Sequence, residues 1–158
     1  MQEQTFKKIL FPTDFSEASN YALAYAVSVA MQYKAKLFIL HVVDMSYDIS
    51  GFYIPHISAE TLQQEMKDWA EKMLKKLTIR MPRSIKAYES AIKIGVPHKE
   101  IIKFAKDKDI DMIIMGTHGK TGVDHFFFGS TTERVLKQAD CPVLTIRPPK
   151  DILVKKRA

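Results

Sequence analysis

Apolar and polar positions along the chain define two alternating kinds of segment. Short, nearly continuous apolar runs predict strands that are buried on both faces, as in parallel sheets. Between them lie longer stretches in which apolar residues recur every three or four positions, the spacing of one helix face. The predicted strands are Phe6–Phe11, Lys36–Val43, Ser84–Ile94, Ile110–Met115 and Pro142–Ile146.

Four helices are predicted between these strands, each from a start signal. The first follows Asp14, the second follows Ser58 as a cap, and the third has Pro97 near its first position. The fourth begins at a capping box formed by Ser130 and Glu133. The residues expected to face inward are Leu23, Val27, Ala30 and Met31, then Leu62, Met66, Trp69, Met73, Leu74 and Leu77, then Ile101, Ile102 and Ala105, and finally Thr132, Val135, Leu136 and Ala139.

The order of strand and helix, repeated four times and closed by a strand, determines the expected fold. Such alternation predicts a single-domain α/β protein with an open, five-stranded parallel sheet and helices on both faces, a Rossmann-like arrangement. We expect the domain to span residues 1–149 and a basic C-terminal tail to follow at 150–158. Ligands of such sheets bind at the carboxyl ends of the strands, where the strand order reverses.

Composition narrows the class of protein further. At 158 residues, with 46% hydrophobic and 27% charged residues, the chain is expected to be one ordinary globular domain. Its longest apolar stretch, Tyr21–Met31, is too short to cross a bilayer, and no secretory signal is expected at its start. The single cysteine, Cys141, cannot form an internal disulfide. We therefore expect a cytoplasmic protein without a membrane partner.

The formal net charge of +6 favours anionic ligands without selecting one. Many of the basic residues lie in two groups, late in the second predicted helix and in the tail. Because no aromatic residues are interleaved with them, we interpret both groups as solvated surface rather than a nucleic-acid site. The first group is Lys72, Lys75, Lys76 and Arg80, and the second is Lys150, Lys155, Lys156 and Arg157.

The strongest local motif is a pair of glycine turns. Gly116-Thr117-His118-Gly119 follows a predicted strand, and Gly129-Ser130 opens a helix after nine intervening residues. Glycines allow close approach of the backbone, and a helix start offers free N–H groups to an anion. A phosphate chain is therefore expected between the two turns. The stretch Gly119-Lys120-Thr121 is not a P-loop, because Ile114 stands where that motif needs a glycine.

This spacing, Gly-x-x-Gly, nine residues, Gly-Ser, resembles the nucleotide-binding signature of the universal stress proteins. The resemblance spans Lys7 to Pro148. It implies a fold like that of the adenine nucleotide alpha hydrolases and an ATP-binding regulatory protein of the stress response. Further segments that are similar to the family are Lys8–Ser16, His41–Asp44, Gly95–His98 and Cys141–Leu144.

The resemblance also implies roles for individual residues. It places Pro12, Thr13 and Asp14 by the adenosine, Val42 at the adenine edge, Met115 and Gly116 on the floor, and Gly119, Gly129, Ser130 and Thr131 around the phosphates. Mg²⁺ or Mn²⁺ would be bound through the phosphates, without a metal site in the protein itself. A homodimer through the last strand, Val143–Ile146, and a protein partner of unknown identity are implied as well.

Several alternatives remain open at this stage. Asp14 is either a nucleotide contact or the cap of the first helix. The same cavity would also suit a slow ATPase or phosphotransferase, with Lys120 supplying charge. Asp124 is the only acid in the glycine loop, and no catalytic base is evident, so we favour a binding protein over a dedicated enzyme. A partner-binding protein with an empty pocket is the third hypothesis. Whether AMP, ADP or ATP would be the resident ligand is left open.

Two further groups of residues have a structural and a functional interpretation. The five histidines show no metal-ligand spacing, and His41 is expected to be packed and hydrogen-bonded rather than catalytic. His118 and His125 are expected to face solvent. The triplet Phe126–Phe128 packs under the glycine loop or forms a hydrophobic partner surface. Cys141 is expected to be chemically inert.

Overall fold

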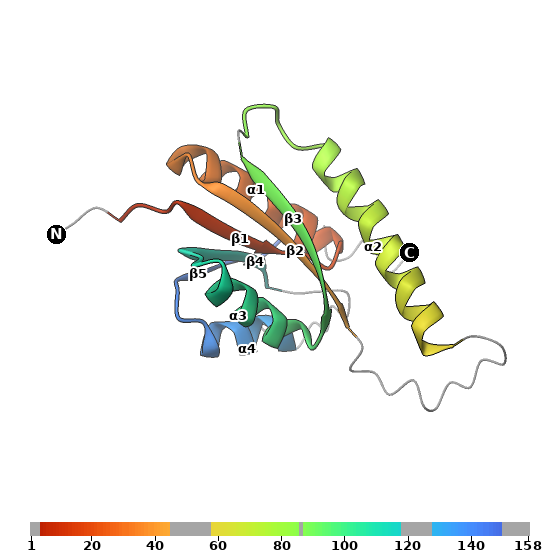
Figure 1. Cartoon of the computed structure of the whole chain (residues 1–158). Coiled ribbons are helices and arrows are strands. Elements are labelled where there is room, and N and C mark those ends of the chain that lie inside the picture. The colour runs from red at the N-terminus through yellow and green to blue at the C-terminus, as the bar shows by residue number, and fades with distance from the viewer. Residues whose placement is uncertain (1–3, 45–57, 86, 118–127, 150–158) are drawn as a thin grey trace.

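The computed structural model describes residues 4–44, 58–85, 87–117 and 128–149, which form a parallel sheet between two layers of helices (Figure 1). Strands and helices alternate throughout, which confirms the predicted fold class. The elements are β1 (Lys8–Pro12), α1 (Glu17–Tyr33), β2 (Lys36–Asp44), α2 (Ala59–Ile79), β3 (Tyr88–Gly95), α3 (Pro97–Asp107), β4 (Met112–Gly116), α4 (Ser130–Gln138) and β5 (Val143–Ile146).

The strand order determines where a ligand site can form. The sheet has the order β3-β2-β1-β4-β5, and all of its neighbouring strands are parallel. Helices α1 and α2 cover one face, and α3 and α4 cover the other (Figure 1). The chain first adds strands on one side of β1 and then on the other. The switch point therefore lies between β1 and β4, where their carboxyl ends leave a crevice.

The central strands contribute to two separate hydrophobic cores. Ile9 and Phe11 of β1 pack with α1 and α2, whereas Leu10, between them, packs with α3 and α4. Likewise Ile114 of β4 belongs to the first core and Ile113 to the second. Successive side chains of a strand point to opposite faces, so a sheet covered on both sides needs consecutive apolar residues. This is why the apolar runs identified the central strands.

Of the two interpretations of Asp14, the cap of the first helix is not found, and the predicted capping box at Ser130 is wrong. Helix α1 is capped by Ser16, whose Oγ accepts from the backbone N of Ser19 at 3.1 Å, so Asp14 is not its cap. Helix α4 has Gly129 as its N-cap and lacks a side-chain capping bond, so Ser130 forms no capping box. Glu133 instead pairs with Lys137 at 2.6 Å. Both residues proposed as caps are therefore left on the wall of the crevice. The predicted cap at Ser58 is confirmed, and Pro97 is the first residue of α3, as expected.

The outer helices are less buried than their apolar stripes predict. Met31, Trp69 and Leu136 were expected to face inward, yet each exposes between 38% and 45% of its surface. In α2 the buried residues are only Ala70, Leu74 and Leu77. Helical periodicity identifies an apolar face, but the area of sheet beneath the helix decides how much of that face is covered.

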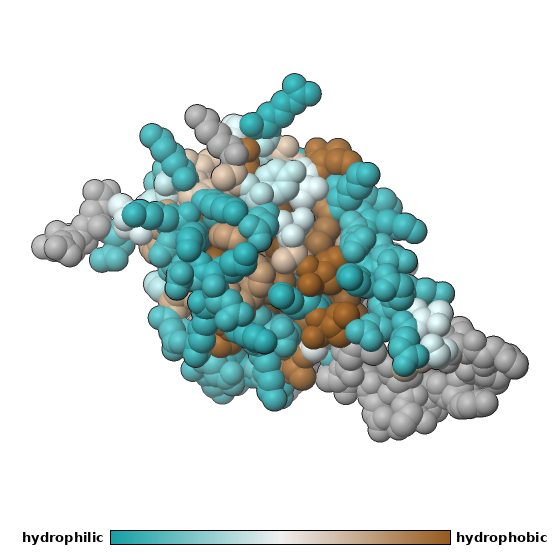
Figure 2. All heavy atoms as spheres, in the orientation of Figure 1, coloured by the Kyte–Doolittle hydropathy of each residue, from teal (hydrophilic) through white to brown (hydrophobic). Residues whose placement is uncertain are grey.

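The edge strand β3 is shorter than predicted, since it begins at Tyr88 rather than Ser84. Among the strands that the structure describes, it pairs only with β2. Tyr88 and Ile94 are partly exposed, and hydrophobic side chains gather along this strand between α2 and α3 (Figure 2). At the end of β3, Gly95 has φ of 148°, a conformation that favours glycine, and a Cβ there would lie 3.1 Å from the Glu100 side chain. This turn leads directly into α3.

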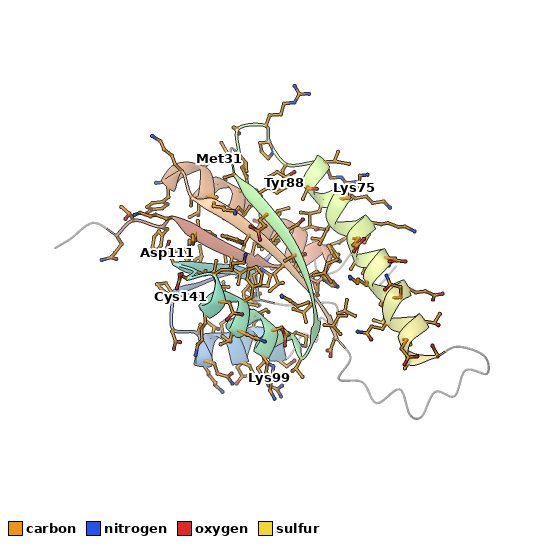
Figure 3. The ribbon with its side chains drawn as sticks, in the orientation of Figure 1. Met31, Lys75, Tyr88, Lys99, Asp111 and Cys141 are labelled. Carbon is orange, nitrogen blue, oxygen red and sulfur yellow. The ribbon has the colours of Figure 1, made fainter. Side chains whose placement is uncertain are left out.

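The outward surface of α2 is hydrophilic (Figure 2). The basic residues in its later half, which include Lys72 and Lys75, are exposed, as expected of a solvated face. Lys75 points away from the sheet (Figure 3). None of the helices in the described segments is long and apolar enough to cross a membrane.

The second residue of α3, His98, gives the stability of the fold a pH dependence. Its side chain is buried, and burial, with smaller contributions from Arg134 and Lys99, lowers its pKa below the ordinary 6.5. The unfolded chain therefore binds a proton more readily below pH 6.5, and stability is lost as the pH falls through the folded pKa. We expect the melting temperature of His98→Gln to fall less than that of the wild type in thermal melts from pH 7.5 to pH 5. Parallel curves for the two proteins would contradict this prediction.

Candidate functional site

A cavity of about 660 Å³ lies at the carboxyl ends of β1, β2 and β4. Helix α2 bounds it on one side, and the amino-terminus of α4 bounds it on another. Ten residues were singled out from the sequence, and nine of them line this cavity: Pro12, Thr13, Asp14, Val42, Met115, Gly116, Gly129, Ser130 and Thr131. The tenth, Gly119, lies outside the described residues.

The turn after β1 is held by its own side chains. Thr13 Oγ1 accepts from the backbone N of Phe15 at 3.0 Å and from Ser19 Oγ at 2.9 Å. Asp14 Oδ1 accepts from the backbone N of Ser16 at 3.0 Å. These bonds hold Phe15 at a φ of 62°, which is rare for a residue with a side chain. The turn therefore presents the Asp14 carboxylate at the cavity wall in a fixed conformation.

The start of α4 is tied to the end of β4. Thr117 O accepts from the backbone N of Gly129 at 2.8 Å, and Thr132 Oγ1 donates to Gly116 O at 3.0 Å. Gly129 has φ of −68° and ψ of 156°, angles that any residue adopts. What glycine supplies at this position is the absence of a side chain beside the cavity. The uncapped first turn directs backbone N–H groups and the positive end of the helix dipole toward that space.

Thr132 is buried, and its hydroxyl is the link that joins α4 to β4. Replacing it with valine keeps the shape but leaves the Gly116 carbonyl without that donor. We expect Thr132→Val to lower the free energy of unfolding by about 1 to 3 kcal/mol. Urea unfolding measures the effect.

Thr78→Val is the matched control, because Thr78 Oγ1 makes the same kind of bond, to Lys75 O at 3.1 Å, on the exposed surface of α2. Its loss of stability is expected to be small, since water replaces the missing partner. Equal losses in the two variants would contradict a structural role for the Thr132 bond.

The sequence identified Val42 of β2, but not His41 of β2 or helix α2, as part of the cavity wall. Leu62, Glu65, Met66 and Trp69 of α2 line it, and so does His41 of β2. His41 is buried, and its Nδ1 lies 2.8 Å from Thr13 O. Because a carbonyl oxygen can only accept, Nδ1 carries the proton. The expectation of a packed, hydrogen-bonded histidine agrees with this geometry. The apolar stripe of α2 was visible in the sequence, but nothing in it distinguished cavity from core.

Other reactive side chains lie elsewhere. Cys141 and Asp111 lie near the amino ends of β5 and β4, at the edge of the sheet opposite the cavity (Figure 3). Burial raises the pKa of the Cys141 thiol, so that it stays protonated and weakly nucleophilic at neutral pH. Across the described segments, no group of three or more histidine, cysteine, aspartate or glutamate side chains is arranged to hold a metal ion. Phe128, the described member of the phenylalanine triplet, is partly exposed.

The fold and the cavity define a class of protein. It is an α/β protein with an open, parallel five-stranded sheet and a cavity at its switch point, bounded by an uncapped helix start. Comparison with known proteins identifies the family. The model of the universal stress protein family matches residues 5–147, and the chain belongs to that family.

Relatives and solved structures agree with this assignment. Universal stress protein MJ0531 of Methanocaldococcus jannaschii is 37% identical over 150 residues, which cover 94% of this chain and 86% of that protein. MJ0577 of the same organism is 32% identical over 154 residues, which cover 90% of this chain and 95% of that protein. The solved structure of MJ0577 superimposes with a TM-score of 0.81 at 31% identity, covering 92% of this chain and 99% of that one. The structure of universal stress protein UspA from Lactobacillus plantarum superimposes with a TM-score of 0.72 at 28% identity. It covers 92% of this chain and 100% of that one.

Proposed function

We propose that this chain is an ATP-binding universal stress protein that acts as a nucleotide-dependent regulatory protein of the stress response. The observation that carries the proposal is the convergence of the glycine signature on one cavity. Gly116 at the end of β4 and Gly129 at the start of α4 line the same space as Asp14, although the sequence separates Asp14 from them by about a hundred residues. The volume of the cavity is in the range of small-molecule sites.

The chemistry of the cavity suits the parts of a nucleotide. Polyphosphate would lie against the uncapped start of α4, where Ser130 and Thr131 add hydroxyl groups to the backbone N–H donors. Asp14 and Val42 line the side of β1 and β2, where the adenosine would be held. A Mg²⁺ or Mn²⁺ ion would come with the nucleotide, because such ions commonly bind phosphate oxygens together with few protein ligands.

Two solved universal stress proteins with this fold are complexes with adenine nucleotides. One contains cAMP and has a TM-score of 0.65 at 18% identity, and the other, from Archaeoglobus fulgidus, contains dAMP and has a TM-score of 0.55 at 19% identity. At these identities the likeness is one of fold. It supports the class of ligand, whereas the triphosphate is inferred from the glycine signature and α4 of this chain.

Ligand identification on protein purified without added nucleotide tests the proposal. Mass spectrometry of the released ligand is expected to find an adenine nucleotide, and calorimetry is expected to show ATP binding to emptied protein. Absence of both would favour the partner-binding alternative. Steady phosphate release that disappears in Ser130→Ala would favour the enzymatic alternative, a slow ATPase or phosphotransferase. Binding without turnover supports the regulatory function.

The proposal extends to assembly in a homodimer through Val143–Ile146. Strand β5 is an edge of the sheet and pairs only with β4 there, and Leu144 on it is 39% exposed. An open edge of this kind offers unpaired backbone groups to a second copy. Under the proposal, nucleotide occupancy changes how the surface of the dimer meets a protein partner.

A further inference from the structure

Trp69 is the only tryptophan in the chain and occupies an unusual position. Its place on the apolar stripe of α2 predicts a core residue, yet it is 45% exposed and lines the cavity. A large aromatic side chain at the wall of a cavity offers a broad apolar surface to whatever binds there.

Trp69 is held in place by two aromatic neighbours from the strand ends. The ring of Phe15 lies 5.5 Å from it, nearly perpendicular at 83°, and the ring of His41 lies 6.3 Å away at 66°. Phe15 and His41 are themselves 4.4 Å apart. Both are anchored to Thr13, which bonds the backbone N of Phe15 and Nδ1 of His41. The aromatic cluster therefore joins α2 to the turn that carries Asp14.

The two sides of the cavity differ in chemistry. The α4 side offers backbone N–H groups and the hydroxyls of Ser130 and Thr131. The α2 side offers mainly apolar side chains, and its lining residues are Leu62, Met66 and Trp69 together with the acidic Glu65. A nucleotide has the same polarity, with anionic phosphates at one end and a planar base at the other. If the phosphates lie on α4, the base would lie farther from α4, where the apolar side chains of α2 are available to it.

We propose that Trp69 contacts the base of the bound nucleotide and supplies a large part of the affinity for the base. The inference rests on the proposed function and adds a residue of α2 to the binding site. Stacking on an aromatic side chain is tolerant of base identity, because every base has a π face. Trp69 therefore distinguishes a nucleoside triphosphate from a bare polyphosphate, and favours purines through their larger ring surface.

The fluorescence of Trp69 tests the contact directly, since no other tryptophan contributes. Titration of emptied wild-type protein with ATP is expected to change the emission, whereas inorganic tripolyphosphate, which has no base, changes it little. In calorimetry, Trp69→Leu is expected to weaken ATP binding by about tenfold or more, while Trp69→Phe keeps most of the affinity. Competition by tripolyphosphate against a fluorescent ATP analogue is expected to be similar in wild type and Trp69→Phe.

Tyr25→Leu is the matched control, because Tyr25 on α1 has a similar exposure of 43% and does not line the cavity. It is expected to bind ATP like the wild type. Wild-type affinity in Trp69→Leu, or an emission that ATP leaves unchanged, would overturn the inference while the proposed function stands. If the wild type binds no adenine nucleotide, both the inference about Trp69 and the proposed function are contradicted. A Trp69→Phe variant as weak as Trp69→Leu would contradict stacking.

Discussion

Replacing Gly129 with valine is expected to abolish ATP binding while leaving the fold intact. Gly129 lines the cavity, and its φ of −68° and ψ of 156° are open to valine. The added side chain would occupy the space at the start of α4 where the phosphates are proposed to lie. We expect ATP affinity in isothermal calorimetry to fall at least about 100-fold, which corresponds to about 2.7 kcal/mol.

The same fold already shows that a valine is tolerated at a helix start. Val96 is the N-cap of α3, with φ of −79° and ψ of 118° and no side-chain capping bond. The intrinsic cost of valine in place of glycine at an N-cap is about 1 kcal/mol. The thermal melt of Gly129→Val should therefore stay close to that of the wild type. Unchanged ATP affinity in a folded Gly129→Val protein would argue against phosphate at this helix. Gly129→Ala, with a smaller side chain, should show a smaller loss of affinity.

Replacing Phe11 with alanine is expected to have the largest effect on stability. Phe11 is fully buried in β1, in the core beneath α1 and α2. Truncation removes its buried apolar surface and leaves a cavity, at a cost of about 3 to 5 kcal/mol. For a domain of this size we expect the melting temperature to fall by roughly 6 to 20 °C. Differential scanning calorimetry measures the change.

Ligand binding should partly reverse this loss. Phe11 immediately precedes Pro12, which lines the cavity. The strand that the substitution destabilises therefore also contributes to the proposed site. A ligand present at 100 times its dissociation constant adds about 2.7 kcal/mol to the stability of the folded state. Melts of Phe11→Ala with and without saturating ATP should therefore differ by several degrees. Ile79→Ala is the control, because Ile79 is 74% exposed. Equal melting temperatures for the two variants without ATP would contradict the assigned burial.

The sheet was well predicted from the sequence because its local pattern and its burial agree. Phe38 and Ile39 are both buried, one in each core, and a strand covered on both faces has no polar position to interrupt its apolar run. The prediction of the edge strand β3 was less accurate. Residues along this strand are partly exposed, so their pattern resembles that of a loop.

The helix-start signals at Asp14 and Ser130 did not identify the capping residues, for a different reason. Asp14 and Ser130 are typical capping residues, and the sequence pattern at both positions is that of a cap. The path of the chain after β1 instead makes Ser16 the cap of α1, and the bonds between the start of α4 and the end of β4 make Gly129 the cap of α4. Local signals locate a helix start within a few residues, but packing of the helix on the sheet selects the residue.

By itself the sequence determined the class of fold and the family, because hydrophobic periodicity and the spacing of glycines are local properties of the chain. The resemblance to the family had already grouped Asp14, Val42 and Gly129 around one ligand, and they line one cavity in the structure. Only the tertiary structure decided that α2 forms part of the cavity wall and that Trp69 lies on that wall rather than in the core. The physical reason is that the apolar stripe of a helix shows which side chains are apolar but not what each of them contacts. Whether such a side chain meets the sheet or a cavity depends on the ends of strands that are distant in sequence and meet only when the sheet forms.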